Sequence, residues 1–88
     1  MNNITFTPAA WQDYLYWQTQ DKKTLNRINQ LLLDISRNGY VGIGKPEPLK
    51  NEFQGFWSRR IDEVNRIIYR IDNGQILVMQ CRTHYGDK

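Results

Sequence analysis

The chain has 88 residues, with 12 Lys or Arg against 9 Asp or Glu, and a formal net charge of +3 at pH 7. This length allows one domain, residues 1–88, with a single modest core, and it excludes a second domain. The small basic excess is compatible with a nucleic-acid partner but does not require one. Because no apolar run approaches a membrane span and no secretory leader pattern is present, we expect a cytoplasmic protein without a membrane partner.

The first half of the sequence predicts a short strand followed by two helices. Residues 3–6 are rich in strand formers. Thr7 supplies an N-cap hydroxyl and a proline follows it, so a first helix is predicted from residue 8 to about residue 19. Asp21 caps a second helix that ends at Gly39, and its apolar face consists of Leu25, Ile28, Leu31, Leu32 and Ile35. The two helices then form a hairpin with a short connection.

The second half predicts a loop and three strands. Residues 39–50 show no periodicity and contain three glycines and two prolines, which indicates an ordered loop. Its length suggests that the loop has a functional role. Residues 56–62, 66–71 and 75–82 read as antiparallel strands joined by tight turns. The order β-α-α-β-β-β predicts an α+β fold in which the helical hairpin packs on one face of a small, mainly antiparallel sheet. The opposite face is then free to carry a site.

Strand alternation assigns side chains to the two faces of this sheet. If the more apolar set of each strand points to the helices, Arg60, Arg66 and His84 lie together on the open face. On the last strand, this choice points Leu77, Met79 and Cys81 toward the helices. Arg59 has the parity of the inner set, so we expect it at a sheet edge with its charged head in water. We expect Cys81 to be a small buried side chain and not a nucleophile.

The turn at residues 72–74 decides on which face His84 lies. A three-residue Asp-Asn-Gly loop, closed by a left-handed glycine, pairs Ile71 with Gln75 and keeps His84 on the open face. A two-residue Asn-Gly turn pairs Asp72 with Gln75 and sends His84 to the opposite face. We favour the three-residue loop.

The open face combines groups that suit metal-free cleavage of a phosphodiester. Glu47 stands between two prolines and two lysines, and His84 is the only histidine. RNA cleavage of this kind needs a base for the 2′-hydroxyl proton, cations around the phosphorane and an acid for the leaving 5′-oxygen. Glutamate, arginine and histidine can fill these roles. With one histidine and no cysteine pair we expect no metal and no cofactor. Each residue alone has an ordinary structural explanation, and their convergence favours the functional one.

Four segments of the chain closely resemble the YoeB toxins (Txe proteins included), a branch of the RelE-like bacterial toxins. They occur in the family's order and at similar spacing over nearly the full length: Trp11-Gln-Asp-Tyr-Leu-Tyr-Trp17, Gly44-Lys-Pro-Glu-Pro-Leu-Lys50, Gly55-Phe-Trp-Ser-Arg-Arg-Ile61 and Cys81-Arg-Thr-His-Tyr85. The resemblance implies a RelE-like fold and the toxin of a type II toxin–antitoxin system. Such a toxin is a ribosome-dependent mRNA endonuclease, or mRNA interferase, that cleaves mRNA in the ribosomal A site and so inhibits translation. The partners implied are the ribosome with its mRNA, an antitoxin of the YefM/Axe type, and a second copy in a homodimer.

The resemblance also implies roles for single residues. Glu47 corresponds to the general base and His84 to the general acid. Arg66 corresponds to the arginine that stabilises the transition-state phosphate, and Tyr85 to a residue that shapes the site. Most RelE relatives outside this branch lack the glutamate and histidine pair, so its presence favours YoeB.

Four further basic residues are candidates for contact with RNA phosphates. Lys50 and Arg60 match basic residues of the family's site, Arg59 is adjacent to Arg60, and Arg82 shares the last predicted strand with His84. The chain departs from the family at residues 86–88, Gly-Asp-Lys, which extend beyond the His-Tyr pair near which family chains commonly end.

Two other functions remain open. A basic module can inhibit the ribosome by occupying it without cleaving RNA. A gyrase-poisoning toxin can share the same fold, although such relatives lack the pair formed here by Glu47 and His84.

Overall fold

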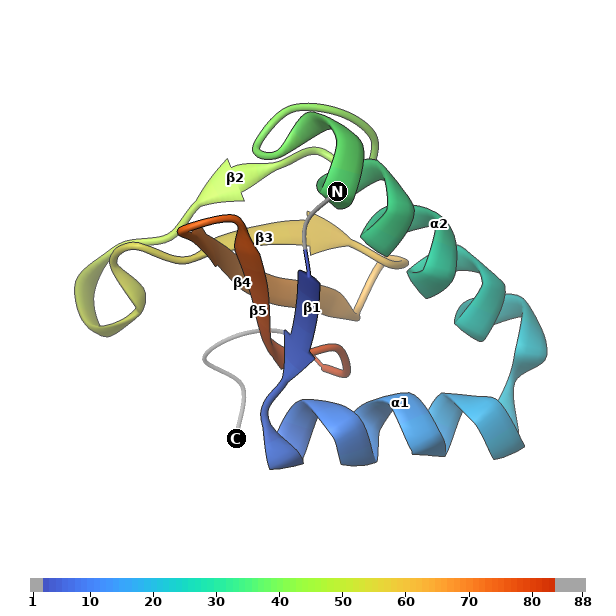
Figure 1. Cartoon of the computed structure of the whole chain (residues 1–88). Coiled ribbons are helices and arrows are strands. Elements are labelled where there is room, and N and C mark those ends of the chain that lie inside the picture. Colours follow the sequence, from blue (N-terminus) through green and yellow to red (C-terminus); the bar gives the residue numbers. More distant parts are fainter. Residues whose placement is uncertain (1–2, 84–88) are drawn as a thin grey trace.

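The computed structural model describes residues 3–83 as a five-stranded sheet with two helices (Figure 1). The elements in chain order are β1 (Asn3–Phe6), α1 (Pro8–Gln20), α2 (Lys22–Asn38), β2 (Glu47–Pro48), a 3-10 turn η1 (Asn51–Phe53), β3 (Trp57–Arg60), β4 (Arg66–Asp72) and β5 (Gln75–Gln80). The strand order is β1-β5-β4-β3-β2. β1 runs parallel to β5, and the other neighbours are antiparallel. The predicted α+β class is confirmed.

The helix boundaries follow from local capping, as predicted. The Thr7 hydroxyl accepts a hydrogen bond from the backbone N–H of Ala10 at the start of α1. Asp21 ends α1 and caps α2, where its carboxylate accepts from the N–H of Thr24. Gly39 ends α2 with a φ of 69°, a conformation that glycine adopts without steric cost. Neither α1 nor α2 has the length and apolar character that crossing a bilayer requires.

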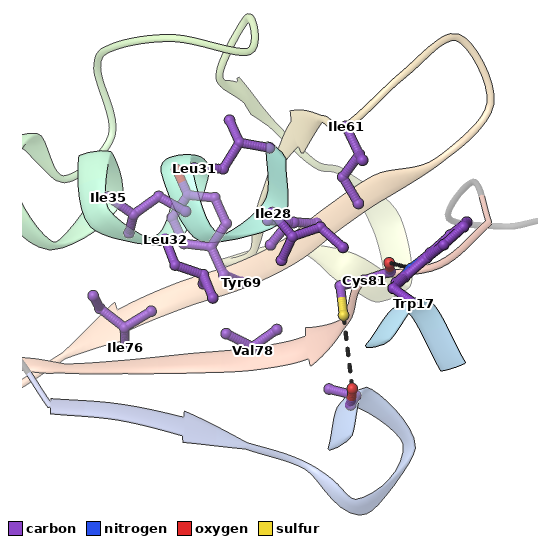
Figure 2. Close-up of a cluster of buried hydrophobic side chains, with 12 residues drawn as sticks. Trp17, Ile28, Leu31, Leu32, Ile35, Ile61, Tyr69, Ile76, Val78 and Cys81 are labelled. Carbon is purple, nitrogen blue, oxygen red and sulfur yellow. Dashed lines mark hydrogen bonds between the residues drawn. The ribbon is translucent and has the colours of Figure 1, made fainter. Parts of the chain in front are cut away.

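Both helices cover the same face of the sheet, and the core lies between them and the strands (Figures 1 and 2). α1 contributes Ala10 and Trp17, whose indole N–H donates to the carbonyl of Cys81 at 2.8 Å. α2 contributes the predicted apolar stripe, of which Ile28, Leu31 and Ile35 are fully buried. Burial raises the pKa of the Cys81 thiol to about 12, so it is protonated at neutral pH and acts as a core side chain, as predicted.

The β4–β5 hairpin differs from the predicted one. Asp72 pairs with Gln75, so the turn is the two-residue Asn73-Gly74, with φ values of 51° and 76°. Positive φ at both positions is what a type I′ turn requires, and Asn-Gly is its preferred sequence. As a result Ile76 and Val78 point into the core. The prediction of a three-residue loop, with Leu77 and Met79 inward, was wrong.

A β-bulge in β5 then reverses the alternation before the strand ends. Tyr69 pairs with Val78, but Ile68 pairs with Gln80, so Met79 is an extra residue on β5. Beyond the bulge, Cys81 is buried in the core, and Gln80 shares the opposite face with Ile68. The bulge thus cancels the change of face that the two-residue turn imposes on the end of β5. Residue 84 lies outside the described residues.

β2 was not predicted, because its two residues fall inside the predicted loop 39–50. Glu47 pairs with Ser58 and Pro48 with Trp57, which makes β2 an edge strand beside β3. Proline is tolerated there because an edge strand needs no ladder donor on its outer side. A strand of two residues is too short to leave a periodic pattern in the sequence, and it is defined only by its pairing with β3.

Candidate active site

The register of the sheet places Glu47 and two predicted arginines on the same face. Glu47 pairs with Ser58, Ser58 with Ile68, and Arg60 with Arg66 two residues further along. Paired residues point to the same side, so Glu47, Arg60 and Arg66 all lie on the face opposite the helices. From the strand spacing, the backbones of Glu47 and Arg66 are about 12 Å apart, which their long side chains can bridge around one phosphate group.

Glu47 is held on β2 by the residues that follow it. Leu49 is buried, and its N–H donates to the carbonyl of Phe56 at 2.9 Å. Glu47 and Lys50, on either side of this anchor, are exposed. The segment therefore presents one carboxylate and one ammonium group to solvent from a backbone fixed by a buried leucine.

Arg66 is buried at the start of β4, and a tight turn fixes one edge of its guanidinium. Nη1 donates to the carbonyls of Asp62 and Asn65 at 2.7 and 3.0 Å. The turn is closed by the Asp62 carboxylate, which accepts from the N–H groups of Val64 and Asn65 at 2.8 and 2.7 Å. Burial raises the pKa of Asp62, but these hydrogen bonds outweigh it and hold the pKa below its ordinary value. Asp62 therefore stays ionised and keeps the turn that orients Arg66.

The same turn also binds the end of the described chain. The backbone N–H of Arg66 donates to the carbonyl of Thr83 at 3.1 Å, and the Asn65 side-chain oxygen accepts from the N–H of Thr83. The segment that leads to residue 84 is thus held beside Arg66. His84 and Tyr85, predicted as general acid and shaping residue, lie outside the described residues. Asn65 was not among the predicted site residues, because its bond to Thr83 joins positions 18 residues apart in the chain.

The other predicted basic residues have different environments. Arg60 is exposed on the candidate face. Arg82 is exposed, and its guanidinium carbon lies 3.6 Å from the ring centroid of Tyr16 on α1, a cation–π contact. Arg70, which was not among the predicted site residues, is exposed two residues from Ile68, with its guanidinium 5.2 Å from the ring of Phe56.

Arg59 is not at the surface, and the prediction of a head in water was wrong. Its side chain has 0% exposure and forms an ion pair with Asp34 of α2. The guanidinium also donates to three loop carbonyls and to the hydroxyl of Tyr69. These partners occupy its donors within the protein, so Arg59 cannot bind an RNA phosphate. The sequence carried no signal for this, because most of the partners are backbone atoms.

Within residues 3–83, no three His, Cys, Asp or Glu side chains gather in a way that could hold a metal ion. What the structure brings together is the Glu47 carboxylate with the guanidinium-bearing Arg60 and Arg66 on a single sheet face.

Solved structures place this fold among the RelE-like toxins. YafQ from Escherichia coli superimposes with a TM-score of 0.78 over 96% of this chain and 94% of that chain at 16% identity, which shows the fold alone. A YoeB/ParE toxin from Agrobacterium tumefaciens is closer, with a TM-score of 0.92 and 40% identity over 94% of this chain and 99% of that chain. The fold is therefore that of a RelE-like toxin.

Sequence comparison gives the family. The profile described as "YoeB-like toxin of bacterial type II toxin-antitoxin system" matches residues 6–85. The chain is 50% identical to the toxin YoeB of Synechocystis, over 93% of this chain and 95% of that protein. It is 48% identical to the toxin YoeB of Streptomyces coelicolor, over 93% and 98%. The toxin in a YoeB–YefM heterotetramer from Staphylococcus aureus is also 48% identical, with a TM-score of 0.89 over 97% and 99%. The chain belongs to the YoeB family of type II toxins.

Proposed function

We propose that this toxin is a ribosome-dependent endoribonuclease that cleaves mRNA in the ribosomal A site and so inhibits translation. The observation that supports this most directly is the strand register. It aligns Glu47 with Ser58, and Arg60 with Arg66, on the face that the helices leave uncovered. A base and phosphate-binding cations on one face are what attack by a 2′-hydroxyl requires.

In the proposed reaction, the Glu47 carboxylate takes the proton of the ribose 2′-hydroxyl. The 2′-oxygen then attacks the adjacent phosphorus, and Arg66 stabilises the charge of the pentacoordinate phosphorane. His84 gives a proton to the leaving 5′-oxygen as the P–O bond breaks, and Tyr85 shapes the site around it. The products are a 2′,3′-cyclic phosphate and a 5′-hydroxyl. No metal or cofactor takes part in these steps.

The proposal includes three partners and a location. Glu47 is exposed on an edge strand, so we infer that the ribosome presents and orients the mRNA against this face. The S. aureus relatives were solved as a YoeB–YefM complex and as a YoeB dimer. We accordingly propose a cognate antitoxin of the YefM/Axe type and a homodimer for this chain. The toxin would act in the cytoplasm, where translation takes place.

The test is to add the wild-type protein to ribosomes translating a defined mRNA and to map the RNA ends. We expect discrete cuts within the A-site codon that leave cyclic phosphate and 5′-hydroxyl termini, and no cuts in the same mRNA without ribosomes. Translation arrest with intact mRNA would overturn the proposal and favour inhibition by occupancy. Cleaved DNA in the presence of gyrase, again with intact mRNA, would favour a gyrase poison.

Lys50, exposed two residues after β2, tests the proposed contact with RNA phosphates. Lys50→Ala is expected to weaken ribosome binding at low salt and to reduce the slope of log affinity against log salt by about one, because one phosphate contact is lost. Binding is measured by co-sedimentation at KCl concentrations from about 50 to about 300 mM. Arg37→Ala is the matched control, since Arg37 is an exposed cation on the helix layer. Equal slopes for Lys50→Ala and wild type would remove Lys50 from the site.

A further inference from the structure

The buried guanidinium of Arg59 organises the loop that leads from α2 to Glu47. Nη2 donates to the carbonyls of Gly39 and Val41 at 2.7 and 2.9 Å, and Nη1 donates to the carbonyl of Ile43 at 3.0 Å. Nε donates to the hydroxyl of Tyr69 at 3.1 Å, which ties the group to β4. One side chain of β3 therefore binds three carbonyls within five consecutive loop residues.

Asp34 completes this arrangement from the helix side. Its Oδ2 pairs with Nη1 of Arg59 and also accepts from the N–H of Ile43 at 3.1 Å. Its Oδ1 accepts from the side-chain amide of Asn38 at 2.8 Å. The backbone of Ile43 is thus held at both its N–H and its carbonyl. We call Asp34, Arg59 and the loop backbone groups that they bind (the N–H of Ile43 for Asp34, three carbonyls for Arg59) the loop clamp.

Two glycines allow the loop to approach the clamp this closely. A Cβ at Gly42 would lie 1.9 Å from Oδ2 of Asp34, and a Cβ at Gly44 would lie 2.8 Å from Leu31. The carbonyl of Gly44 accepts from the N–H of Arg60 at 2.7 Å, so the loop is joined to β3 directly after the clamp. Glu47 follows three residues later, which is at most about 10 Å of extended chain.

β2 has little other support on its N-terminal side. The strand is two residues long, and Pro46 and Pro48 have no backbone N–H to donate. Loop residues 39–44, held by the clamp and by the Arg60 N–H, are therefore the nearest hydrogen-bonded backbone before Glu47. Catalytic groups must be held within about 0.5 Å of their productive position, and a displacement of about 1 Å can reduce a rate 10²-fold.

We propose that Arg59, together with Asp34, is a positioning residue for Glu47: the buried clamp sets the path of loop 39–44 and so fixes the carboxylate on the open face. The inference rests on the proposed function, in which Glu47 is the general base. It gives the first arginine of the Ser58-Arg59-Arg60 segment, Arg59, a role distinct from that of its exposed neighbour Arg60.

The test uses two variants that disturb the clamp in different ways. Arg59→Lys keeps the charge but removes the planar fork that binds several carbonyls. Gly42→Ala leaves Arg59 and Asp34 in place but pushes a methyl group against the Asp34 carboxylate. Gly55→Ala is the matched control, since Gly55 also has a positive φ, 95°, in a loop next to β2, but an added Cβ there meets nothing within 4 Å.

We expect Gly42→Ala and Arg59→Lys to lower kcat for ribosomal mRNA cleavage by about 10- to 100-fold, with KM for ribosomes within about twofold of wild type. Hydrogen exchange should accelerate in residues 41–49 and remain unchanged in β4 and β5. Gly55→Ala should retain kcat within about threefold. If Arg59→Lys does not fold, Gly42→Ala alone provides the test.

The outcomes separate this inference from the proposed function. If wild type cleaves and both clamp variants cleave equally fast, the inference is overturned and the function stands. If both variants lose activity only in proportion to a lower folded fraction, without local exchange in 41–49, the clamp is merely structural and the inference also fails. A wild type that does not cleave overturns the function itself.

Discussion

Glu47→Gln and His84→Gln are each expected to slow single-turnover cleavage of A-site mRNA by about 10²–10⁴, because in the proposed reaction each removes one proton transfer from the transition state. Glutamine keeps the shape of glutamate, and Glu47 is exposed on an edge strand, so the fold should not change. The rate is measured with toxin in excess over programmed ribosomes, so that product release does not limit it.

Ribosome binding must be measured alongside these rates. Both variants should co-sediment with ribosomes as the wild type does, which separates lost chemistry from lost association. Asp72→Asn is the control for removal of one negative charge, since Asp72 is exposed at the end of β4, next to the β4–β5 turn. Cleavage by Glu47→Gln at the wild-type rate would exclude Glu47 as the base, whatever the behaviour of His84→Gln.

The second large effect concerns stability. Asp34→Ala is expected to lower the free energy of unfolding by about 3–5 kcal/mol, because it leaves the fully buried charge of Arg59 without its counter-ion. Asp34→Asn should cost less, since an amide oxygen can still accept from Arg59. Urea denaturation followed by tryptophan fluorescence measures both. Replacing the whole pair, as Asp34→Ala with Arg59→Met, should recover part of the loss, whereas strictly additive losses would argue against a coupled pair.

The pair also predicts how stability depends on pH. The hydrogen bond from Arg59 holds the pKa of Asp34 below its ordinary value. A carboxyl with a lowered folded pKa stabilises the fold above its unfolded pKa of about 3.9, and this stability is lost as pH falls through the folded pKa. Wild type should therefore lose stability below about pH 4, and Asp34→Asn should lose less over the same interval. If the free energy of unfolding falls in parallel for the two proteins between about pH 5 and pH 2, this assignment is contradicted.

Local chemistry explains what the sequence could predict of the fold. Thr7, Asp21 and Gly39 act within one helical turn of their own positions, so the ends of both helices could be assigned without tertiary information. The hairpin turn was different. Both side-chain sets of β5 are apolar, so alternation could not tell Ile76 from Leu77, although the turn preference of Asn-Gly pointed to the observed pairing.

The candidate site was only partly accessible to the same reasoning. Strand parity correctly placed Arg60 and Arg66 together, because both lie on regular strands paired in register. Arg59 could not be interpreted, since its acidic partner Asp34 is 25 residues away on a helix. Its other partners on the loop are carbonyls, which every residue type carries. β2 escaped prediction for a related reason: two residues between prolines have no period.

The sheet has its first and last strands side by side, with Asn3 opposite Gln75. β1 has β5 as its neighbour, and β5 is the final strand along the described chain. During synthesis β1 therefore lacks its neighbour until β5 has been made, and pairing across such a long stretch is slow to form. Assembly of the complete sheet thus waits for β5, which follows every other described strand and both helices along the chain.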